Sequence, residues 1–196
     1  MAWIVIAIAA WGVVHSLLAS MQFKDFLRGK LGSGVMRAYR FSYNIFSVIT
    51  FAPLLVLMKV LPDRPFYAVA PPWMYLMLAG QGLAILCLLI TFLQTDALSF
   101  VGLRQFVEDE KPSALVMNGF YRLVRHPLYL FSLLFIWLSP VMTFNMLIVW
   151  VSLTAYLFIG AYFEERKLLR EFGAAYADYK SRTPMMIPGL IFTRNK

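Results

Sequence analysis

The residues best placed to do chemistry lie in one short stretch, residues 118–129, which reads NGFYRLVRHPLY. It places Arg125 and His126 directly before Pro127, at the start of a long apolar segment. Proline is favoured at the first helical position because its missing N–H would have no partner there and its φ is already helical. We therefore expect a helix that begins at Pro127 with His126 at or near the N-cap. The unpaired N–H groups of its first turn, the helix dipole and the two cationic neighbours would form an anion site.

Two adjacent acidic residues, Glu164 and Glu165, follow the last long apolar segment. If that segment forms a hairpin with the one after Pro127, the acids face Arg125 and His126. Such a site fits a zwitterionic ligand, with its carboxylate near the cations and its ammonium near Glu164 or Glu165. Successive residues on a helix point about 100° apart, so we expect only one of the two acids to face the ligand.

Aromatic side chains near these charges would stack on a ring or face a cation. They are Tyr121, Tyr129, Tyr176 and Tyr179. S-adenosylmethionine is one ligand with the required features, since it carries an amino acid head, an adenine ring and a sulfonium.

The composition indicates an integral membrane protein. The 196 residues are 61% hydrophobic and only 14% charged, which is more apolar side chain than a soluble domain of this length has interior positions to hold. One domain is the natural count for this length. The single cysteine, Cys87, excludes a disulfide within the chain, and the sequence has no Cys/His clusters at metal-ligand spacing, so we expect no metal cofactor.

Five apolar segments divide the chain, at about residues 2–20, 41–61, 73–93, 128–141 and 142–163. The first three have close to the ~20 residues that ~30 Å of hydrocarbon requires, and the first has no cleavage pattern of a signal peptide. The fourth is short: residues 128–139 would span roughly 18 Å as a helix. Either this helix begins below the membrane interface or it continues past Pro140 with a kink.

The basic residues predict the orientation. All except Lys59 and Arg64 lie in the stretches 21–40, 94–127 and 164–196. The positive-inside rule then predicts an all-α bundle of five transmembrane helices, with the N-terminus outside, the C-terminus cytoplasmic and a cytoplasmic C-terminal helix. The net charge of +8 reflects topology and contact with lipid headgroups, and nucleic acid is not an expected partner.

The motifs resemble those of the isoprenylcysteine carboxyl methyltransferase superfamily of membrane enzymes. The matching pieces, in family order, are Leu115-Val116, residues 119–121, residues 125–129, Glu164-Glu165 with Leu168, Phe172-Gly173 with Tyr176 and Tyr179, Pro184, and Ile187-Pro188. A finer resemblance is to the bacterial branch that contains methanethiol S-methyltransferases, and to a related family named for nitrite and nitric oxide reduction. It rests on His15-Ser16, Phe23-Lys24, Thr95-Asp96, residues 102–105, residues 137–143 and residues 183–188. One departure is Phe131, where these families usually carry Gly.

The resemblance implies a single methyltransferase domain over residues 1–196, with a three-helix part (1–93) and a cofactor-binding part (94–196). It also implies a location in the bacterial inner membrane, with a cytoplasmic S-adenosylmethionine site and a small thiol or an isoprenylcysteine-like carboxylate as acceptor. The residue patterns and the resemblance together predict the cofactor-binding residues Val116, Gly119, Tyr121, Arg125, His126, Pro127, Tyr129, Glu164, Glu165 and Tyr176, and the candidate catalytic residues are Arg125, Glu165 and Arg182. Either arginine would orient a carboxylate or stabilise a thiolate.

Other functions are weighed against the enzyme. A transporter would carry ionisable groups near the bilayer midplane, yet only His15 lies in a helix centre, so this class is excluded. A non-catalytic membrane accessory protein remains the alternative. In that reading Arg125 and His126 are interfacial anchors, the two glutamates are a solvated helix end, and Tyr176 and Tyr179 form an interfacial aromatic belt.

Overall fold

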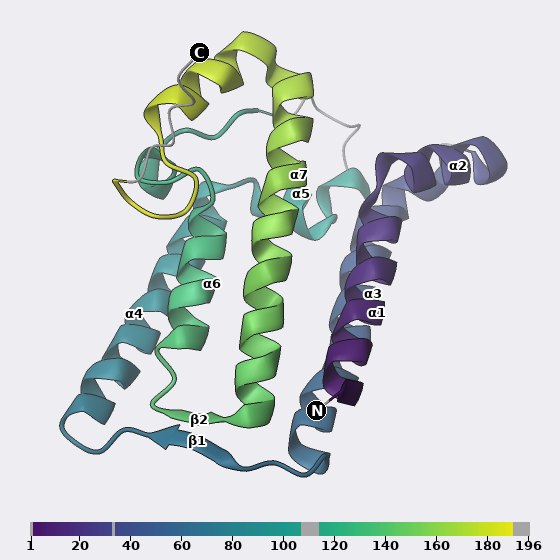
Figure 1. Ribbon diagram of the computed structural model, residues 1–196. Coiled ribbons are helices and arrows are strands. Elements are labelled where there is room, and N and C mark those ends of the chain that lie inside the picture. The colour runs from purple at the N-terminus through teal and green to yellow at the C-terminus, as the bar shows by residue number, and fades with distance from the viewer. Residues whose placement is uncertain (1, 33, 107–113, 190–196) are drawn as a thin grey trace, which may run out of the picture. The chain divides into compact units, whose positions relative to one another are not determined.

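The protein is described by a computed structural model that covers residues 2–32, 34–106 and 114–189 (Figure 1). Lys111, Arg194 and Lys196, which contribute to the charge distribution above, lie outside these described residues. The α-helices are α1 (Ala2–Ala19), α2 (Met21–Leu31), α3 (Gly34–Val60), α4 (Trp73–Gln94), α5 (Ala97–Val101), α6 (Pro127–Trp137) and α7 (Phe144–Arg182). Two 3-10 helices, η1 (Arg104–Phe106) and η2 (Gly119–Arg122), and a two-stranded sheet of β1 (Pro65–Ala68) and β2 (Val141–Thr143) complete the described part.

The predicted all-α membrane class is confirmed in part, because the described residues are mostly helical but include the short sheet of β1 and β2. Four helices in the described residues, α1, α3, α4 and α7, are long and apolar enough to cross a membrane. Helix α6 is apolar but has only 11 residues, or roughly 17 Å of helical rise. It begins at Pro127 with His126 as the N-cap, as predicted, and it ends at Trp137. The alternative in which this helix continues past Pro140 with a kink is therefore wrong, because the chain enters β2 one residue after Pro140.

The chain forms two compact units. Unit 1 comprises Met1–Phe66, Asp96–Pro112 and Thr143–Ser152, and unit 2 comprises Tyr67–Thr95, Ser113–Met142 and Leu153–Lys196. In unit 1, helices α1 and α3 pack against each other. His15 of α1 is held by α3, since its Nε2 lies 2.6 Å from the Tyr43 hydroxyl and its Nδ1 lies 3.0 Å from Ser47 Oγ. His15 is thus a hydrogen-bonded helix residue.

A buried asparagine fixes the end of α3 within unit 1. The Asn145 side-chain amide, fully buried, lies 3.3–3.4 Å from the backbone oxygens of Met58, Leu61 and Pro62. Its backbone N–H donates to Asp63 Oδ1 at 3.0 Å. Carbonyl groups at a helix C-terminus have no partner within the helix, and this amide supplies donors to them.

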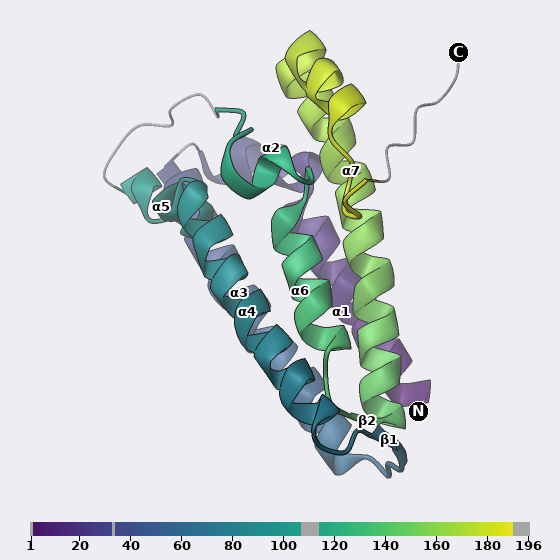
Figure 2. The same ribbon diagram turned by 90° about the vertical axis from the view of Figure 1, so that its left-hand side faces the viewer.

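In unit 2, α4 packs along α6 in both views (Figures 1 and 2). Gln81 of α4 donates from Nε2 to the Phe135 carbonyl at 2.9 Å, a polar bond inside an otherwise apolar contact. Helix α7 bends at Gly173, whose φ of 53° and ψ of −125° are not helical and strongly favour glycine. The last turns of α7 therefore fold back, as the yellow-green end of the ribbon shows in Figure 1.

Replacing Asn145 by Ala should destabilise the protein by about 0.5–1.5 kcal/mol, because the carbonyl groups of Met58, Leu61 and Pro62 at the end of α3 lose a side-chain donor. Val151→Ala on the same helix, at a side chain that is 51% exposed, is the matched control and should change stability by less than about 0.5 kcal/mol. Thermal unfolding in detergent measures both. Equal effects of the two substitutions would show that the amide does not stabilise the end of α3.

Candidate active site

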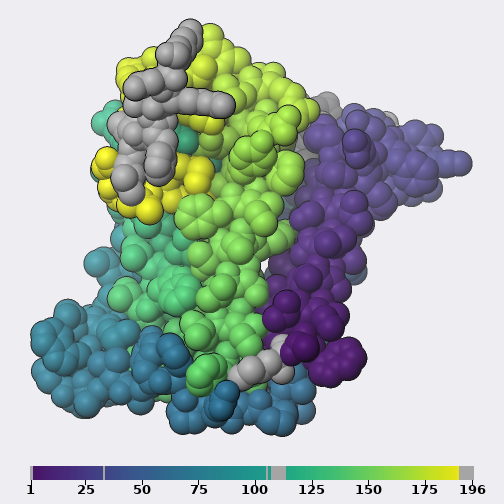
Figure 3. Space-filling model, in the orientation of Figure 1, coloured from purple at the N-terminus to yellow at the C-terminus, as the bar shows by residue number. Residues whose placement is uncertain are grey.

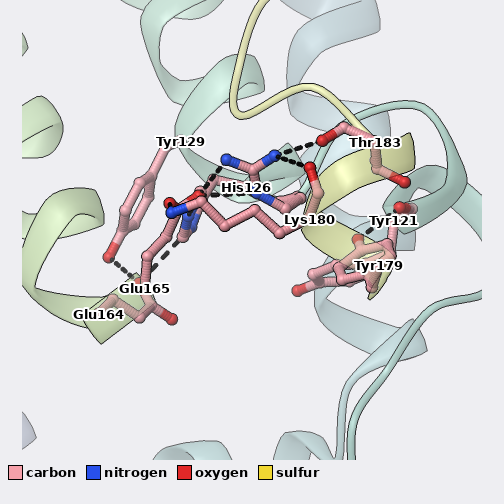
Figure 4. A network of polar contacts seen from close by, with 9 residues as sticks. Tyr121, His126, Tyr129, Glu164, Glu165, Tyr179, Lys180 and Thr183 are labelled. Carbon is pink, nitrogen blue, oxygen red and sulfur yellow. Dashed lines mark hydrogen bonds and ion pairs between the residues drawn. The ribbon is translucent and has the colours of Figure 1, made fainter. Parts of the chain in front are cut away.

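Five ionisable side chains form one cluster in unit 2, which we call the charged cluster: Arg125, His126, Glu164, Glu165 and Lys180 (Figure 4). The first two belong to the turn that leads into α6, and the acids lie on α7 just after its apolar part. Lys180 lies beyond the Gly173 bend, which brings the last turns of α7 back to the same place. The predicted meeting of the Arg-His pair with the two acids is observed.

Arg125 is a buried clamp. Its Nε donates to Glu165 Oε1 at 2.7 Å, and its Nη2 forms a second contact with the same oxygen. Its Nη1 donates to the backbone carbonyls of Lys180, at 3.1 Å, and of Thr183. With the side chain only 8% exposed, the guanidinium is enclosed by partners from its own chain. A planar fork with five N–H groups is suited to such a junction, which a lysine would not satisfy.

The segment that follows α7 lies along this turn. The backbone N–H groups of Arg125 and His126 donate to the carbonyls of Pro184 (2.9 Å) and Met185 (3.0 Å). Thr183, Pro184 and Met186 are buried. Sequence reasoning did not predict this contact, and the only signal for it was the place of residues 183–188 in the resemblance.

The two glutamates have different environments. Glu165 is 7% exposed, and its Oε2 lies 2.5 Å from Lys180 Nζ while its Oε1 contacts Arg125 and lies 3.5 Å from His126 Nε2. Glu164 is 44% exposed and accepts a hydrogen bond from the Tyr129 hydroxyl at 2.9 Å. Its carboxylate also lies 3.6 Å from His126 Nδ1. Glu165 is therefore neutralised internally, and Glu164 is the acid that faces outward.

The predicted tyrosines surround the cluster. The ring of Tyr129 stacks on His126, with centroids 5.3 Å apart and planes inclined by 7°. Tyr179 donates from its hydroxyl to the Tyr121 carbonyl at 2.5 Å, and its ring lies 6.0 Å from that of Tyr176. Tyr176 and Tyr179 are 1% and 7% exposed, so they pack inside unit 2 and do not form an exposed belt.

The Tyr121 phenol stays protonated near neutral pH. Burial, with a further contribution from the negative charge of Glu164, raises the pKa of Tyr121 to about 12. The phenol therefore keeps its proton in the physiological range, and it is unsuited to act as a base there.

Of the remaining predicted residues, Gly119 and Val116 lie in or just before η2, whereas Arg182 lies away from the charged cluster. Gly119 has a φ of +55°, and a Cβ there would fall on the side-chain amide of Gln94, whose Oε1 accepts from Phe120 N at 3.1 Å. Val116 is half-buried just before η2. Arg182 is not brought to the cluster: its side chain is 72% exposed and pairs with Asp178 one turn earlier.

Phe131 and Lys180 also contribute to the structure around the site. Phe131, the departure from the family pattern, packs edge-on against Phe120 with centroids 4.9 Å apart, so the ring joins α6 to η2. Lys180, which sequence reasoning missed, enters the cluster only because of the bend at Gly173. The glycine was part of the resemblance, but nothing in the spacing indicates where the turned-back helix places its lysine.

The comparisons with known proteins identify the class. The model of the phospholipid methyltransferase family matches residues 75–175. Methanethiol S-methyltransferase 2 of Bradyrhizobium diazoefficiens is 40% identical over 54% of this chain and 44% of its own length. Methanethiol S-methyltransferases of a Pseudomonas species and of Pseudomonas deceptionensis are 32% and 30% identical over 93% and 95% of this chain.

The chain thus spans less than half of the first of these relatives and 71% and 72% of the other two. No solved structure matches it significantly. The apolar helices, the family match and these relatives support the class of membrane methyltransferases. The chain belongs to the phospholipid methyltransferase family, and the predicted resemblance is confirmed.

Replacing Arg125 by Lys should detach residues 183–186, because an ammonium cannot reach Glu165 and two carbonyls together. We expect a loss of about 1–3 kcal/mol in stability, because the carbonyls of Lys180 and Thr183 lose their donor while the charge beside Glu165 is kept, and we expect faster hydrogen exchange in that segment. Arg182→Lys, at the exposed pair with Asp178, is the control and should change neither quantity. Unchanged exchange at residues 183–186 in the Arg125 variant would contradict the clamp.

Proposed function

We propose that this chain transfers a methyl group from S-adenosylmethionine to a small thiol at the cytoplasmic face of the membrane. The observation that carries the proposal is the charged cluster, which combines an outward-facing acid with a partly exposed cation beside aromatic rings. The thiol acceptor is supported by relatives that are named methanethiol S-methyltransferases. An isoprenylcysteine-like carboxylate is the second candidate acceptor, while a non-catalytic accessory role is not favoured by these relatives.

The exposures of the side chains suggest how a zwitterionic head is held. The ammonium would bind Glu164, whose carboxylate is 44% exposed. The carboxylate would bind Lys180, which is 40% exposed and would exchange its contact with Glu165 for the ligand. Arg125 and His126, 8% and 4% exposed, would then act by positioning, because their polar groups already face the two glutamates.

The other predicted cofactor-binding residues keep supporting roles in this proposal. Tyr129 would hold Glu164 in place through its hydroxyl, and Tyr121 would line the aromatic side of the site. Tyr176, which is 1% exposed, would support the site by packing inside unit 2. Gly119 and Val116 would shape the chain before η2, and Pro127 would start α6. Glu165 would stabilise the cations of the cluster, and Arg182 has no part in this arrangement.

S-adenosylmethionine, when bound, supplies an electrophilic methyl group on a sulfonium. The acceptor thiol would lose its proton to solvent, and the site would hold the thiolate sulfur in line with the methyl carbon and the sulfonium sulfur, so that the methyl group passes from one sulfur to the other. The protein need only align the three atoms and exclude water.

We also propose that residues 1–196 act as a single methyltransferase domain with five transmembrane helices, the short α6 included, an external N-terminus and a cytoplasmic C-terminus. This is supported by the location of nearly all basic residues in the stretches 21–40, 94–127 and 164–196. Helix α7, at 39 residues, is about twice as long as a bilayer requires, so its charged second half would extend into the cytoplasm of the cell.

The topology can be tested with single cysteines in a Cys87→Ser background. Arg64→Cys should react with a membrane-impermeant maleimide in intact cells, whereas Gly29→Cys should react only after permeabilisation, because α2 would face the cytoplasm. Gly29 suits the test because a Cβ there meets nothing within 4 Å. Labelling of both positions in intact cells, or the reverse pattern, would refute the proposed orientation.

Cofactor binding is tested by calorimetric titration of S-adenosylhomocysteine into the detergent-purified protein. Glu164→Gln and Lys180→Met should each weaken binding by about 10-fold or more, since each removes a charge-assisted hydrogen bond. Glu171→Gln, an exposed acid on the same helix, is the matched control and should bind as the wild type does.

Turnover of methanethiol to dimethyl sulfide is then followed with the same variants. Absence of saturable binding by folded wild type would reject the methyltransferase proposal. Binding without turnover of the thiol would reject only the acceptor, and a prenylcysteine would be tested next. Full binding by Glu164→Gln would reject the placement of the ammonium.

A further inference from the structure

Gly160 leaves an open position on one side of α7. It lies one helical turn after Tyr156 and one turn before Glu164, so these three residues share a side of the helix. Gly160 and Tyr156 are half-buried. On the same side, Glu164 accepts a hydrogen bond from Tyr129 of α6 at 2.9 Å. The adjoining side is exposed, as at Phe163, and Figure 3 shows α7 at the surface in light green. Gly160 therefore lies between the side of α7 that contacts α6 and its exposed side.

The open position is not a site of close helix packing. Small residues in membrane helices commonly let a neighbouring helix approach. A Cβ added at Gly160 meets nothing within 4 Å, whereas one added at Gly80 of α4 would lie 2.8 Å from Leu138 Cδ1. Within the described residues, α6 packs along α4 and reaches this part of α7 through long side chains, such as Trp137, whose Nε1 donates to Thr154 Oγ1 at 3.0 Å. The side chain that Gly160 lacks thus leaves space that the described chain does not fill.

An acid and two aromatic residues border the open position. A helical side chain leans toward the N-terminus of its helix, so that of Glu164 leans over Gly160. Tyr129 holds Glu164 from the opposite helix, and the Tyr156 hydroxyl lies close enough to that of Tyr129 to interact with it electrostatically. Aromatic rings beside a carboxylate suit a ligand that is both cationic and partly apolar.

The spacing along α7 limits what the open position can hold. Tyr156 and Glu164 are eight residues apart, which is about 12 Å of helical rise. The next step rests on the proposed function, in which Glu164 binds the ammonium of S-adenosylmethionine. Three carbon atoms separate that nitrogen from the sulfonium, a length close to one helical turn of about 5.4 Å. The sulfonium would then lie beside Gly160, and roughly one further turn remains before Tyr156.

We propose that the open position at Gly160 is the acceptor subsite, where a short thiol meets the methyl group, and that Tyr156 closes it on the side away from Glu164. One turn of space holds a thiol such as methanethiol but not the isoprenyl chain of a prenylcysteine. A side chain at residue 160 would occupy the place of the acceptor. The subsite lies within unit 2, and it decides between the two candidate acceptors of the proposed function.

The test measures thiol binding apart from turnover. The detergent-purified full chain is saturated with S-adenosylhomocysteine, and methanethiol or butanethiol is then titrated in a calorimeter. Gly160→Ala should weaken methanethiol binding about threefold and Gly160→Val about 10-fold or more, because the added methyl groups fill the subsite. S-adenosylhomocysteine, which lacks the transferred methyl group, should still bind both variants. Gly82→Val is the control, since Gly82 is an exposed glycine of α4 where a Cβ also meets nothing within 4 Å, and it should bind both ligands as the wild type does.

The far side of the subsite is tested with Tyr156→Ala, which should improve butanethiol binding at least fivefold and leave methanethiol binding unchanged, because the space becomes longer. Phe158→Ala, at an exposed ring of the same helix, is the control and should keep the preference of the wild type for the short thiol. Monodisperse elution of each variant confirms folding, and the variants at residues 156 and 160 are independent of each other.

The possible failures of the test are distinguishable. Unchanged thiol affinity in Gly160→Val with S-adenosylhomocysteine bound would overturn the subsite and leave the proposed methyl transfer intact. A changed oligomeric state with unchanged thiol affinity would overturn it in favour of a helix contact. Loss of S-adenosylhomocysteine binding in this variant would overturn it in favour of a part of the cofactor site. Absence of S-adenosylhomocysteine binding by folded wild type would reject the proposed function, and this inference with it.

Discussion

The site depends on the ion pair between Arg125 and Glu165, both less than a tenth exposed. Removing two charges from water costs several kcal/mol per ion, and the cost is offset only where geometry and additional hydrogen bonds are good. Here the second carboxylate oxygen meets Lys180, and the guanidinium also donates to two carbonyls. The pair therefore joins three elements: the turn before α6, the middle of α7 and the segment after it.

This constraint explains why α7 must bend. A straight continuation of α7 would carry Lys180 far from Glu165, since 15 residues of helix rise about 22 Å. The backbone of Gly173 adopts a conformation that is costly for other residues, and the helix folds back so that Tyr176, Tyr179 and Lys180 pack on the turn before α6. The bend at Gly173 thus places the last turns of α7 against the turn that leads into α6.

The sequence was sufficient for local features and insufficient for long-range ones. Proline's fixed φ predicted the start of α6 at Pro127, and hydrophobic segment lengths predicted the apolar helices and the membrane class, whereas α2 lies in a stretch predicted as a loop. The difference between Glu164 and Glu165 could be anticipated only as a 100° separation, because which of them is enclosed depends on Lys180 and Arg125. Arg182 was a candidate only because a cation could orient a carboxylate or favour a thiolate. Its exposed pairing with Asp178 is the i, i+4 contact that helix spacing also allows.

The balance of charge decides which residues remain available to a ligand. Within the charged cluster, Glu165 faces Arg125, Lys180 and His126. The negative charge of Glu165 is therefore already compensated and would attract an incoming ammonium only weakly. Glu164 faces only His126 and the neutral hydroxyl of Tyr129 among the contacts described here, and it retains nearly half of its surface. A zwitterion that binds Glu164 and draws Lys180 away leaves Glu165 paired with Arg125. The cluster then gains a ligand without leaving any buried charge unpaired, which is the condition that an apolar environment imposes.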